Sequence, residues 1–150
     1  MNVRKATLND VDNNLASIFI KGFRFHLNGR PDIFDSNKSD EELKNELINT
    51  IQNDNNVLIV EESGNVQGFI IFQIKNKHDK TMWIDQLVVD NDFRGKGIAK
   101  LLISKVTDIA IEEKCKRIEL CCWKFNSNAN EMYKHLGFDE QRTIFERKIS

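Results

Sequence analysis

The segment from residue 81 to residue 123 constrains the fold of this chain more than any other. Residues 81–89 form an apolar run of strand length, residues 97–114 carry apolar side chains at helical spacing, and residues 117–123 alternate again. Two strands of one sheet that are joined through a helix are connected almost always by a right-handed crossover, which makes them parallel. The sequence therefore predicts a parallel strand pair with a helix packed on it.

The remaining strands are predicted to lie around this pair. Residues 56–62 and 66–75 have strand character, and the Ser63-Gly64-Asn65 segment between them is typical of a hairpin turn. Residues 2–6 predict a first strand, and residues 138–149 predict one or two closing strands. Together these segments predict a mixed α/β sheet, mostly antiparallel, with helices on both faces.

Three more helices are expected. The first begins near Asp10 and is followed by a loop over residues 27–36, which contain a glycine and a proline. The second begins at Ser39, because a serine followed three residues later by glutamate is a capping box. A short helix over residues 127–136 ends at Gly137, which can adopt the left-handed conformation of a helix cap.

Composition and charge exclude several classes of protein. The chain has 150 residues and a net charge of -1, and this length fits one domain over residues 1–150. A nucleic-acid-binding domain usually carries a basic surplus, so no nucleic-acid partner is expected. No stretch approaches the ~20 apolar residues of a membrane span, and residues 1–10 lack the apolar core of a signal peptide. We therefore expect a cytoplasmic protein that has no membrane partner.

The cysteines and histidines do not suggest a metal site. Neither residue type has the spacing of zinc ligands, and the residues concerned are Cys115, Cys121, Cys122, His26, His78 and His135. The adjacent pair Cys121 and Cys122 has no histidine or aspartate in a triad-like position, so an acyl-enzyme mechanism is not favoured. A cysteine on a strand is more often a small core residue.

The turn between the strand and the helix predicts an anion site. Residues 90–99 leave a strand, pass through Arg94-Gly95-Lys96-Gly97 and enter an amphipathic helix. Glycines allow a close backbone approach, and the free N–H groups of the helix start attract phosphate. The segment fits neither the Walker A pattern nor the dinucleotide GxGxxG pattern. The alternative is that Gly95 and Gly97 merely cap a surface helix.

Two blocks of the sequence resemble one family. The segment 94–99 resembles the Arg/Gln-x-x-Gly-x-Gly/Ala signature of the GNAT superfamily, the acyl-CoA-dependent N-acetyltransferases. Asn126, Ala129, Tyr133 and the pair Gly137-Phe138 are similar to a second block of that family. The resemblance implies the GNAT fold, in which the two central strands splay apart. It also implies a transferase that moves acetyl from acetyl-CoA directly to a primary amine of a small molecule or peptide.

The resemblance also implies positions that bind CoA. The turn backbone would hold the pyrophosphate, the strand before it would follow the pantetheine arm, and two positions of the short helix would contact CoA. These positions are Arg94, Gly95, Lys96, Gly97, Ile98, Ala99, Leu87, Val88, Val89, Asn126 and Ala129. Asn126 has a second interpretation, because asparagine is a good helix N-cap without any ligand.

Tyr133 and Asp85 are the predicted catalytic residues. The resemblance places Tyr133 beside the CoA sulfur, where a phenol can protonate the leaving thiolate; the alternative is an aromatic residue that packs its helix on the sheet. Strand alternation places Asp85 on one face with Trp83, Leu87 and Val89. In some members a glutamate at this place is the general base. The alternative is an exposed or ion-paired carboxylate.

The acceptor side is predicted less specifically. His26 and Arg30 are expected in the loop after the first helix, a region that lines the acceptor pocket in the family. Trp83 and Trp123 are the other predicted acceptor contacts. Two rival functions are a GNAT-like domain that senses CoA without catalysis and a nucleotide-dependent phosphotransferase. The acceptor is not defined by the sequence, and a homodimer is compatible with it.

Overall fold

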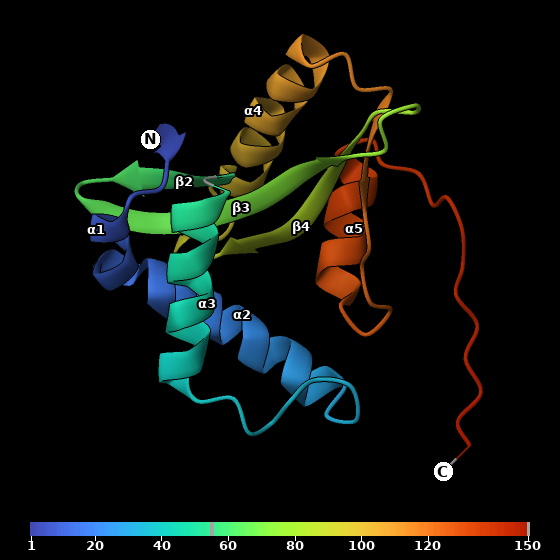
Figure 1. Cartoon of the computed structure of the whole chain (residues 1–150), viewed down its shortest axis with the longest axis horizontal. Helices are drawn as coiled ribbons and strands as arrows, with labels where there is room; N and C mark the ends of the chain where they lie inside the picture. The colour runs from blue at the N-terminus through green and yellow to red at the C-terminus, as the bar shows by residue number, and fades with distance from the viewer. Residues whose placement is uncertain (55, 150) are drawn as a thin grey trace.

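The computed structural model describes residues 1–54 and 56–149 (Figure 1). Within these residues, five strands form one sheet in the order of the chain. The strands are β1 (Asn2–Lys5), β2 (Val57–Glu62), β3 (Asn65–Lys75), β4 (Thr81–Val89) and β5 (Arg117–Leu120). Strands β1 to β4 pair antiparallel, and β4 and β5 pair parallel. The predicted mixed, mostly antiparallel sheet is confirmed.

The parallel pair is joined over part of its length. Residues 81–84 of β4 pair with residues 117–120 of β5, and β4 then continues to Val89 without that neighbour. The strand predicted over 117–123 therefore ends three residues early. Beyond Ile84, the two chain segments separate, as the predicted splayed pair requires.

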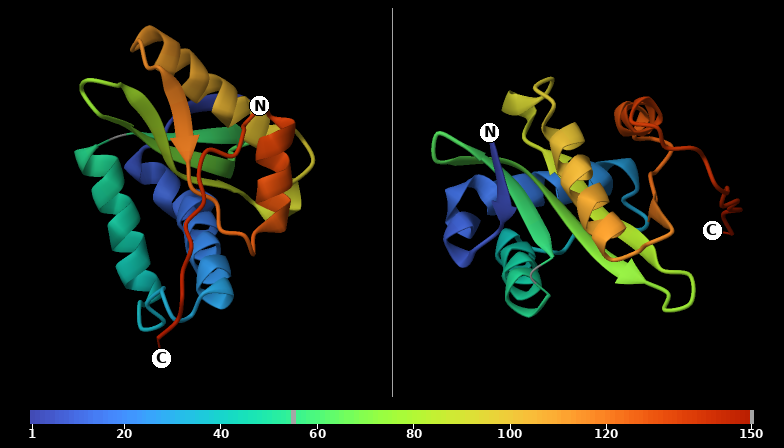
Figure 2. Two further views of the ribbon diagram at one scale, coloured as in Figure 1. Left: turned by 90° about the vertical axis from the view of Figure 1, so that its right-hand side faces the viewer. Right: turned by 90° about the horizontal axis from the view of Figure 1, so that it is seen from above.

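Helices cover both faces of the sheet (Figure 2). Their bounds are α1 (Leu8–Asp10), η1 (Val11–Leu15), α2 (Ala16–Gly29), α3 (Asp40–Asn53), η2 (Asn91–Phe93), α4 (Ile98–Glu112) and α5 (Ser127–His135). Helices α2 and α3 lie on one face, and α4 and α5 lie on the other. In the described part of the chain, no helix combines the length and the apolar character that crossing a membrane requires.

The N-terminal helices differ in detail from the prediction. The first helix begins at Leu8, is interrupted at Asn13 and Asn14, and then continues through Gly29, so the first part of the predicted 27–36 loop is helical. Asn14 has φ 74°, a left-handed conformation that asparagine tolerates better than most residues. The predicted start of α3 is confirmed, because the Ser39 hydroxyl accepts a hydrogen bond from the Glu42 N–H at 3.1 Å.

Two apolar cores stabilise the layers. The core between the sheet and helices α2 and α3 is built from side chains that include Leu15, Ile18, Phe19, Leu43, Leu47, Ile59 and Phe69. The core between the sheet and α4 includes Val60, Ile70, Phe72, Met82, Ile84, Leu102 and Val106. Burying one such side chain contributes roughly 1.5–3 kcal/mol, so the two cores fix where β4 and the start of α4 lie.

A β-bulge changes the faces of β4. Gln86 pairs with Ile71 of β3 and Ile84 pairs with the next residue, which leaves Asp85 as an extra residue without a partner. The predicted common face is therefore wrong for Leu87 and Val89, which pack with the α4 core, whereas Val88 packs against the α2 and α3 core. An extra residue shifts the two-residue alternation by one position, and this is the physical reason for the error.

The end of the chain does not form the predicted closing strands. Residues 139–149, here called the C-terminal tail, are extended and make no backbone hydrogen bond in the described part of the chain. The tail leaves the body after α5 and runs along the outer side of the molecule (Figures 1 and 2). A strand needs a neighbour to satisfy its backbone groups, and residues 1–54 and 56–149 supply none for the tail.

Candidate active site

The turn between β4 and α4 is held by a buried carboxylate. Asp90 is 6% exposed; it accepts hydrogen bonds from the Asp92 N–H at 3.2 Å and from Asn14 Nδ2 at 2.8 Å. Burial alone would raise the pKa of Asp90, but the hydrogen bond from Asn14 and the backbone bond from Asp92 hold it below its ordinary value. Asn14 also donates to the Val66 carbonyl at 2.8 Å. This one asparagine thereby ties the first helical segment to the turn.

Two glycines give the turn its shape. Gly95 and Gly97 both have φ 80°, and Gly97 is the N-cap residue of α4. A Cβ at either position would meet no atom within 4 Å, so the backbone conformation, rather than lack of space, favours glycine here. The open space also leaves the backbone accessible from outside. The first N–H groups of a 15-residue helix are directed at this space, which makes it suitable for an anion.

The side chains of the turn add positive charge. Arg94 is the residue after η2, and Lys96 lies between the two glycines with its Nζ 5.3 Å from the centre of the Phe93 ring. Ile98 is buried in the α4 core and anchors the start of the helix, while Ala99 lies in its first turn. The geometry fits the predicted pyrophosphate site, and the assignment of these residues to CoA stays a prediction.

The split between β4 and β5 begins where their pairing ends. The last three residues of β4 have no β5 residue paired with them, and these are Leu87, Val88 and Val89. Helix α2 packs closely behind them, because a Cβ on Gly22 would lie 3.1 Å from a methyl group of Val88. A strand edge without a neighbour leaves N–H and C=O groups free for an extended ligand.

Asn126 is the N-cap residue of α5, and Tyr133 lies within that helix. The Asn126 Oδ1 atom accepts a hydrogen bond from the Ala129 N–H at 3.3 Å, so the helix-cap interpretation is confirmed. Contact between Asn126 and CoA stays a prediction. The Tyr133 ring meets Phe138 edge to face at 5.6 Å and packs against the α4 core. Burial, with a smaller contribution from Cys122, raises the pKa of Tyr133 well above its ordinary value, so the phenol keeps its proton.

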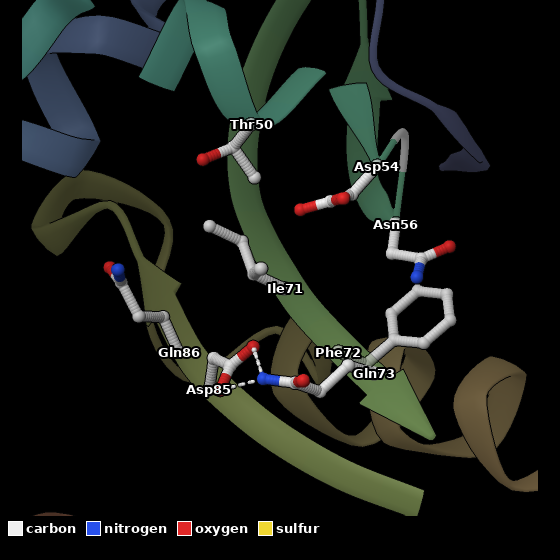
Figure 3. Close-up of a pocket in the computed structure, with 8 residues that line it drawn as sticks. All are labelled: Thr50, Asp54, Asn56, Ile71, Phe72, Gln73, Asp85 and Gln86. Atoms are coloured by element: carbon white, nitrogen blue, oxygen red, sulfur yellow. Dashed lines mark hydrogen bonds between the residues drawn. The ribbon is translucent and has the colours of Figure 1, made fainter. Parts of the chain in front are cut away.

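Asp85 lines a pocket on the α3 side of the sheet (Figure 3). The pocket has a volume of about 320 Å³, and its walls come from the end of α3, from β3 and from the bulge of β4. The lining residues are Thr50, Asp54, Asn56, Ile71, Phe72, Gln73, Asp85 and Gln86. Gln73 Nε2 donates to both carboxylate oxygens of Asp85 at 3.0 Å. Asp85 is exposed, which agrees with the alternative interpretation of an exposed carboxylate, and among the described residues it forms no ion pair.

The other lining residues were not found from the sequence. Thr50 and Asp54 lie near the end of α3, whereas Gln73 lies on β3 and meets Asp85 across the sheet. They have no common motif and become neighbours only through the strand register. Gln73 could have been noticed because it lies in an otherwise apolar strand segment, where a polar side chain needs a hydrogen-bond partner.

His26, Arg30 and Trp123 form an aromatic cluster with Phe34 and Phe125. His26 lies in the last turn of α2, not in a loop as predicted, and its Nδ1 atom is 2.8 Å from the Gly22 carbonyl oxygen. Its ring lies 5.7 Å from Phe34 and 6.0 Å from Phe125. The Arg30 guanidinium lies 5.1 Å from the centre of the Trp123 ring, which stacks on Phe125 at 6.1 Å.

Trp83 lies apart from this cluster. It pairs with Glu119 in the closed part of the β4 and β5 pair, and Lys75 Nζ lies 4.3 Å from the centre of its ring. The structure therefore brings three of the predicted acceptor residues together and leaves Trp83 with the closed pair. Burial raises the pKa of the Cys122 thiol, and the nearby Cys121 raises it further. A raised thiol pKa disfavours a nucleophilic thiolate.

Comparisons with known proteins agree with this fold. The BH1408 protein of Bacillus halodurans, solved as a mutant, superposes with a TM-score of 0.84 at 25% identity over 100% of both chains. An aminoglycoside N-acetyltransferase solved in complex with CoA has the same fold, with a TM-score of 0.70 and 20% identity over 99% of this chain and 95% of that one.

Curated relatives match part of the chain. The spermine/spermidine N(1)-acetyltransferase of Bacillus subtilis is 30% identical over 81 residues, which cover 50% of this chain and 53% of the relative. The thialysine N-epsilon-acetyltransferase of Bos taurus is 27% identical over 70 residues, covering 47% and 41%. The chain thus spans about half, or less, of the length of these relatives.

A family model decides the assignment. Residues 23–138 match the model described as the acetyltransferase (GNAT) family, and this range includes the turn, the split and the pocket. Because the match extends over well more than half of the chain and agrees with the fold, the chain belongs to the acetyltransferase (GNAT) family.

Proposed function

We propose that this protein is an N-acetyltransferase that transfers the acetyl group of acetyl-CoA directly to a primary amine of a small molecule or peptide. The observation that carries the proposal is the parallel strand pair that opens after Ile84 beside a turn with two left-handed glycines. An open strand edge and a helix start at one end of it suit a long ligand that has a diphosphate at one end. A thioester carrier of the CoA class has this shape.

Different groups of residues would bind different parts of acetyl-CoA. The backbone of residues 94–99 would hold the pyrophosphate, helped by the charges of Arg94 and Lys96. The free edge of β4 at residues 87–89 would bond the pantetheine amides in the manner of an added strand. The acetyl group would then lie near Val88 and Trp123, where unpaired strand N–H groups could polarise its carbonyl. A relative of the same fold was solved in complex with CoA, which supports this proposal.

The transfer needs two proton movements. The amine nitrogen attacks the thioester carbon, the N–C bond forms, and the C–S bond then breaks. Tyr133 would give its proton to the departing thiolate, because burial raises the pKa of its phenol and keeps it protonated. The amine loses one proton before attack and one as the amide forms. Asp85, exposed at the pocket, would accept a proton directly or through a water molecule.

The pocket supports an amine as the acceptor. Asp54 and Asp85 are two carboxylates that line one opening of about 320 Å³, and Gln73 and Thr50 add neutral polar groups. Carboxylates around an opening attract ammonium groups and raise their local concentration. The relatives named after spermine, spermidine and thialysine support the same class of acceptor.

Turnover distinguishes this proposal from a CoA sensor. Purified protein is given acetyl-CoA and a panel of amines that includes diamines, amino sugars and N-terminal peptides, and free thiol is measured. We expect thiol release that depends on the amine and formation of an N-acetyl product by mass spectrometry. Tight CoA binding by calorimetry without turnover on any amine would favour the sensor. Failure to bind CoA at all would contradict both functions.

A further inference from the structure

The turn after β5 carries two large aromatic side chains of the acceptor-side cluster. Residues 123–126, here called the aromatic turn, are closed by a hydrogen bond from the Asn126 N–H to the Trp123 carbonyl oxygen at 3.0 Å. The rings of Trp123 and Phe125 stack on one another at 6.1 Å, with 24° between their planes. The position of this one turn therefore decides where both rings lie.

Asn130 reaches back from α5 to the aromatic turn. Its Nδ2 atom donates to the Trp123 carbonyl oxygen at 2.9 Å and to the Asn126 carbonyl oxygen at 2.8 Å. A side-chain amide nitrogen has two N–H groups, so each carbonyl can receive one of them. Because both partners are acceptors, only the nitrogen end of the amide fits at this place. Asn130 thus holds the first and the last residue of the turn with a single group.

Cys122 makes weaker contacts to the same two carbonyl groups. Its Sγ atom lies 3.8 Å from the Trp123 oxygen and 4.0 Å from the Asn126 oxygen, and a thiol is a weak donor. Asparagine is also a poor residue for a helix interior, because its side chain competes for backbone groups. At Asn130 this competition is directed at the aromatic turn. The residue therefore serves the turn rather than the helix in which it lies.

Helix α2 fixes the aromatic turn from the opposite side. Gly29 is the last residue of α2, and a Cβ at this position would lie 2.3 Å from an atom of the Phe125 ring. Real Cβ atoms do not approach other atoms so closely, so any side chain at Gly29 would displace the ring. The aromatic turn is therefore held between two tight constraints, the end of α2 and the amide of Asn130.

We infer that Asn130 is a positioning residue for the acceptor amine and acts through the rings of Trp123 and Phe125. The inference rests on the proposed acetyl transfer, in which the acetyl group lies near Trp123. Asn130 bonds the aromatic turn and not the substrates, and the rings of the turn form a wall for the bound amine. A displaced wall lowers the fraction of amine that is bound in an attacking geometry.

The binding of CoA does not depend on the Asn130 amide. The side chain of Asn126, which is predicted to contact CoA, is held by the Ala129 N–H at 3.3 Å, and this bond does not involve Asn130. The anion turn at residues 94–99 follows β4 and lies in another part of the chain. Loss of the Asn130 amide should therefore affect the amine and leave the affinity for CoA unchanged.

A pair of asparagine substitutions in α5 tests the inference. Asn130→Asp keeps the shape of the side chain but replaces the two N–H donors with an oxygen that faces two carbonyl oxygens. Asn128→Asp is the matched control, because it makes the same change at an exposed side chain two residues earlier in α5. Both variants place a negative charge near the start of the helix, where it is favourable, so α5 should stay folded.

The expected result is a change that is specific to the amine. In Asn130→Asp, kcat/KM for the amine should fall about tenfold, which corresponds to the loss of one hydrogen bond. In Asn128→Asp it should stay close to the wild-type value, and calorimetry should show the same CoA affinity in both variants. Wild-type turnover with equal amine kinetics in the two variants would overturn this inference alone. Wild-type protein without turnover on any amine would overturn the proposed function.

Nuclear magnetic resonance tests the positioning without turnover. The chain has two tryptophans, and each gives one indole N–H signal, which the spectrum of Trp83→Phe assigns. Asn130→Asp should shift the Trp123 signal and leave the Trp83 signal in place, because Trp83 lies in the closed strand pair. Asn128→Asp should shift neither signal. An unmoved Trp123 signal in Asn130→Asp would overturn the inference.

A substitution on α2 decides the case if Asn130→Asp does not fold. Gly29→Ala displaces Phe125 from the opposite side and leaves the amide of Asn130 intact. It should shift the Trp123 indole signal and lower kcat/KM for the amine while CoA affinity is retained. A shifted Trp123 signal with unchanged amine kinetics would show that the wall does not position the amine, and it would overturn the inference.

Discussion

The hydroxyl of Tyr133 provides the sharpest test of the chemistry. We predict that Tyr133→Phe lowers kcat about 10²-fold, the low end of the usual effect of one acid–base group. The low end is expected because a CoA thiolate has a pKa of roughly 8–9 and is not a strongly basic leaving group. A 10²-fold loss corresponds to about 2.7 kcal/mol of transition-state stabilisation. The ring still packs against Phe138 and the α4 core, so CoA affinity should change little.

The structure also predicts the pH dependence of this loss. Burial raises the pKa of Tyr133 well above its ordinary value, so the phenol is protonated throughout an assay between pH 6 and pH 9. The ratio of wild-type to Tyr133→Phe rates should therefore be constant across this range. The rates are measured as thiol release, with single-turnover experiments to ensure that chemistry limits the rate.

A neighbouring substitution separates chemistry from packing. Phe138→Leu removes the ring that meets Tyr133 and should lower the melting temperature while keeping most of kcat at a temperature well below the transition. An unchanged single-turnover rate in Tyr133→Phe would refute the reasoning and assign the proton transfer to water or to another group. A loss that appears equally in Phe138→Leu would show that packing, rather than the hydroxyl, is responsible.

Three other outcomes are expected. Gly97→Val should abolish CoA binding in a folded protein, measured by calorimetry, whereas Gly64→Val, with the same strained φ in the β2–β3 hairpin, should retain it; normal affinity in the first variant would contradict the anion site. Asp85→Asn should lower kcat with CoA binding intact, and an unchanged kcat under single-turnover conditions would exclude a role as base. Asp10→Asn should lower the free energy of unfolding by about 2–3 kcal/mol at pH 7, because Arg4 loses two 2.8 Å charged bonds. The hydrogen bond from Arg4 lowers the pKa of Asp10 in the folded protein. The loss of unfolding free energy in Asp10→Asn should therefore be complete above the unfolded pKa of about 3.9, and it should disappear as the pH falls through the lower pKa of the folded state. A loss that persists in acid would contradict this reasoning.

The sheet and the turn were predictable because local signals and connection rules suffice for them. The strand, helix and strand over residues 81–123 allow only a right-handed crossover connection. Gly95 and Gly97 indicate a turn, because glycine can adopt backbone conformations that other residues avoid. The pocket was not predictable in the same way. Gln73 and Asp85 meet only because β3 and β4 pair in one particular register. That register contains a bulge, which no local feature of the sequence predicts.

The tail failed as a prediction for a different reason. Its alternation of polar and apolar residues is typical of a strand, but a strand needs a paired neighbour, and the part of the chain that the structure describes does not supply one. Within the described residues the segment stays extended and exposed, held at Glu146 by Arg30.

The bulge explains why the proposed base and the split in the sheet occur together. The last pair between β4 and β5 joins Ile84 to Leu120, and Asp85, the extra residue of the bulge, comes directly after it. A bulge bends its strand and increases the local twist, which is consistent with the end of the β4–β5 pairing at this point. The same extra residue cannot point into either core and is left exposed at the pocket beside Gln73. One irregularity in β4 therefore both opens the edge that would receive the thioester and presents a carboxylate beside it. The proposed base and the opening between β4 and β5 therefore do not require two separate sequence features, because the strand geometry produces both at adjacent residues.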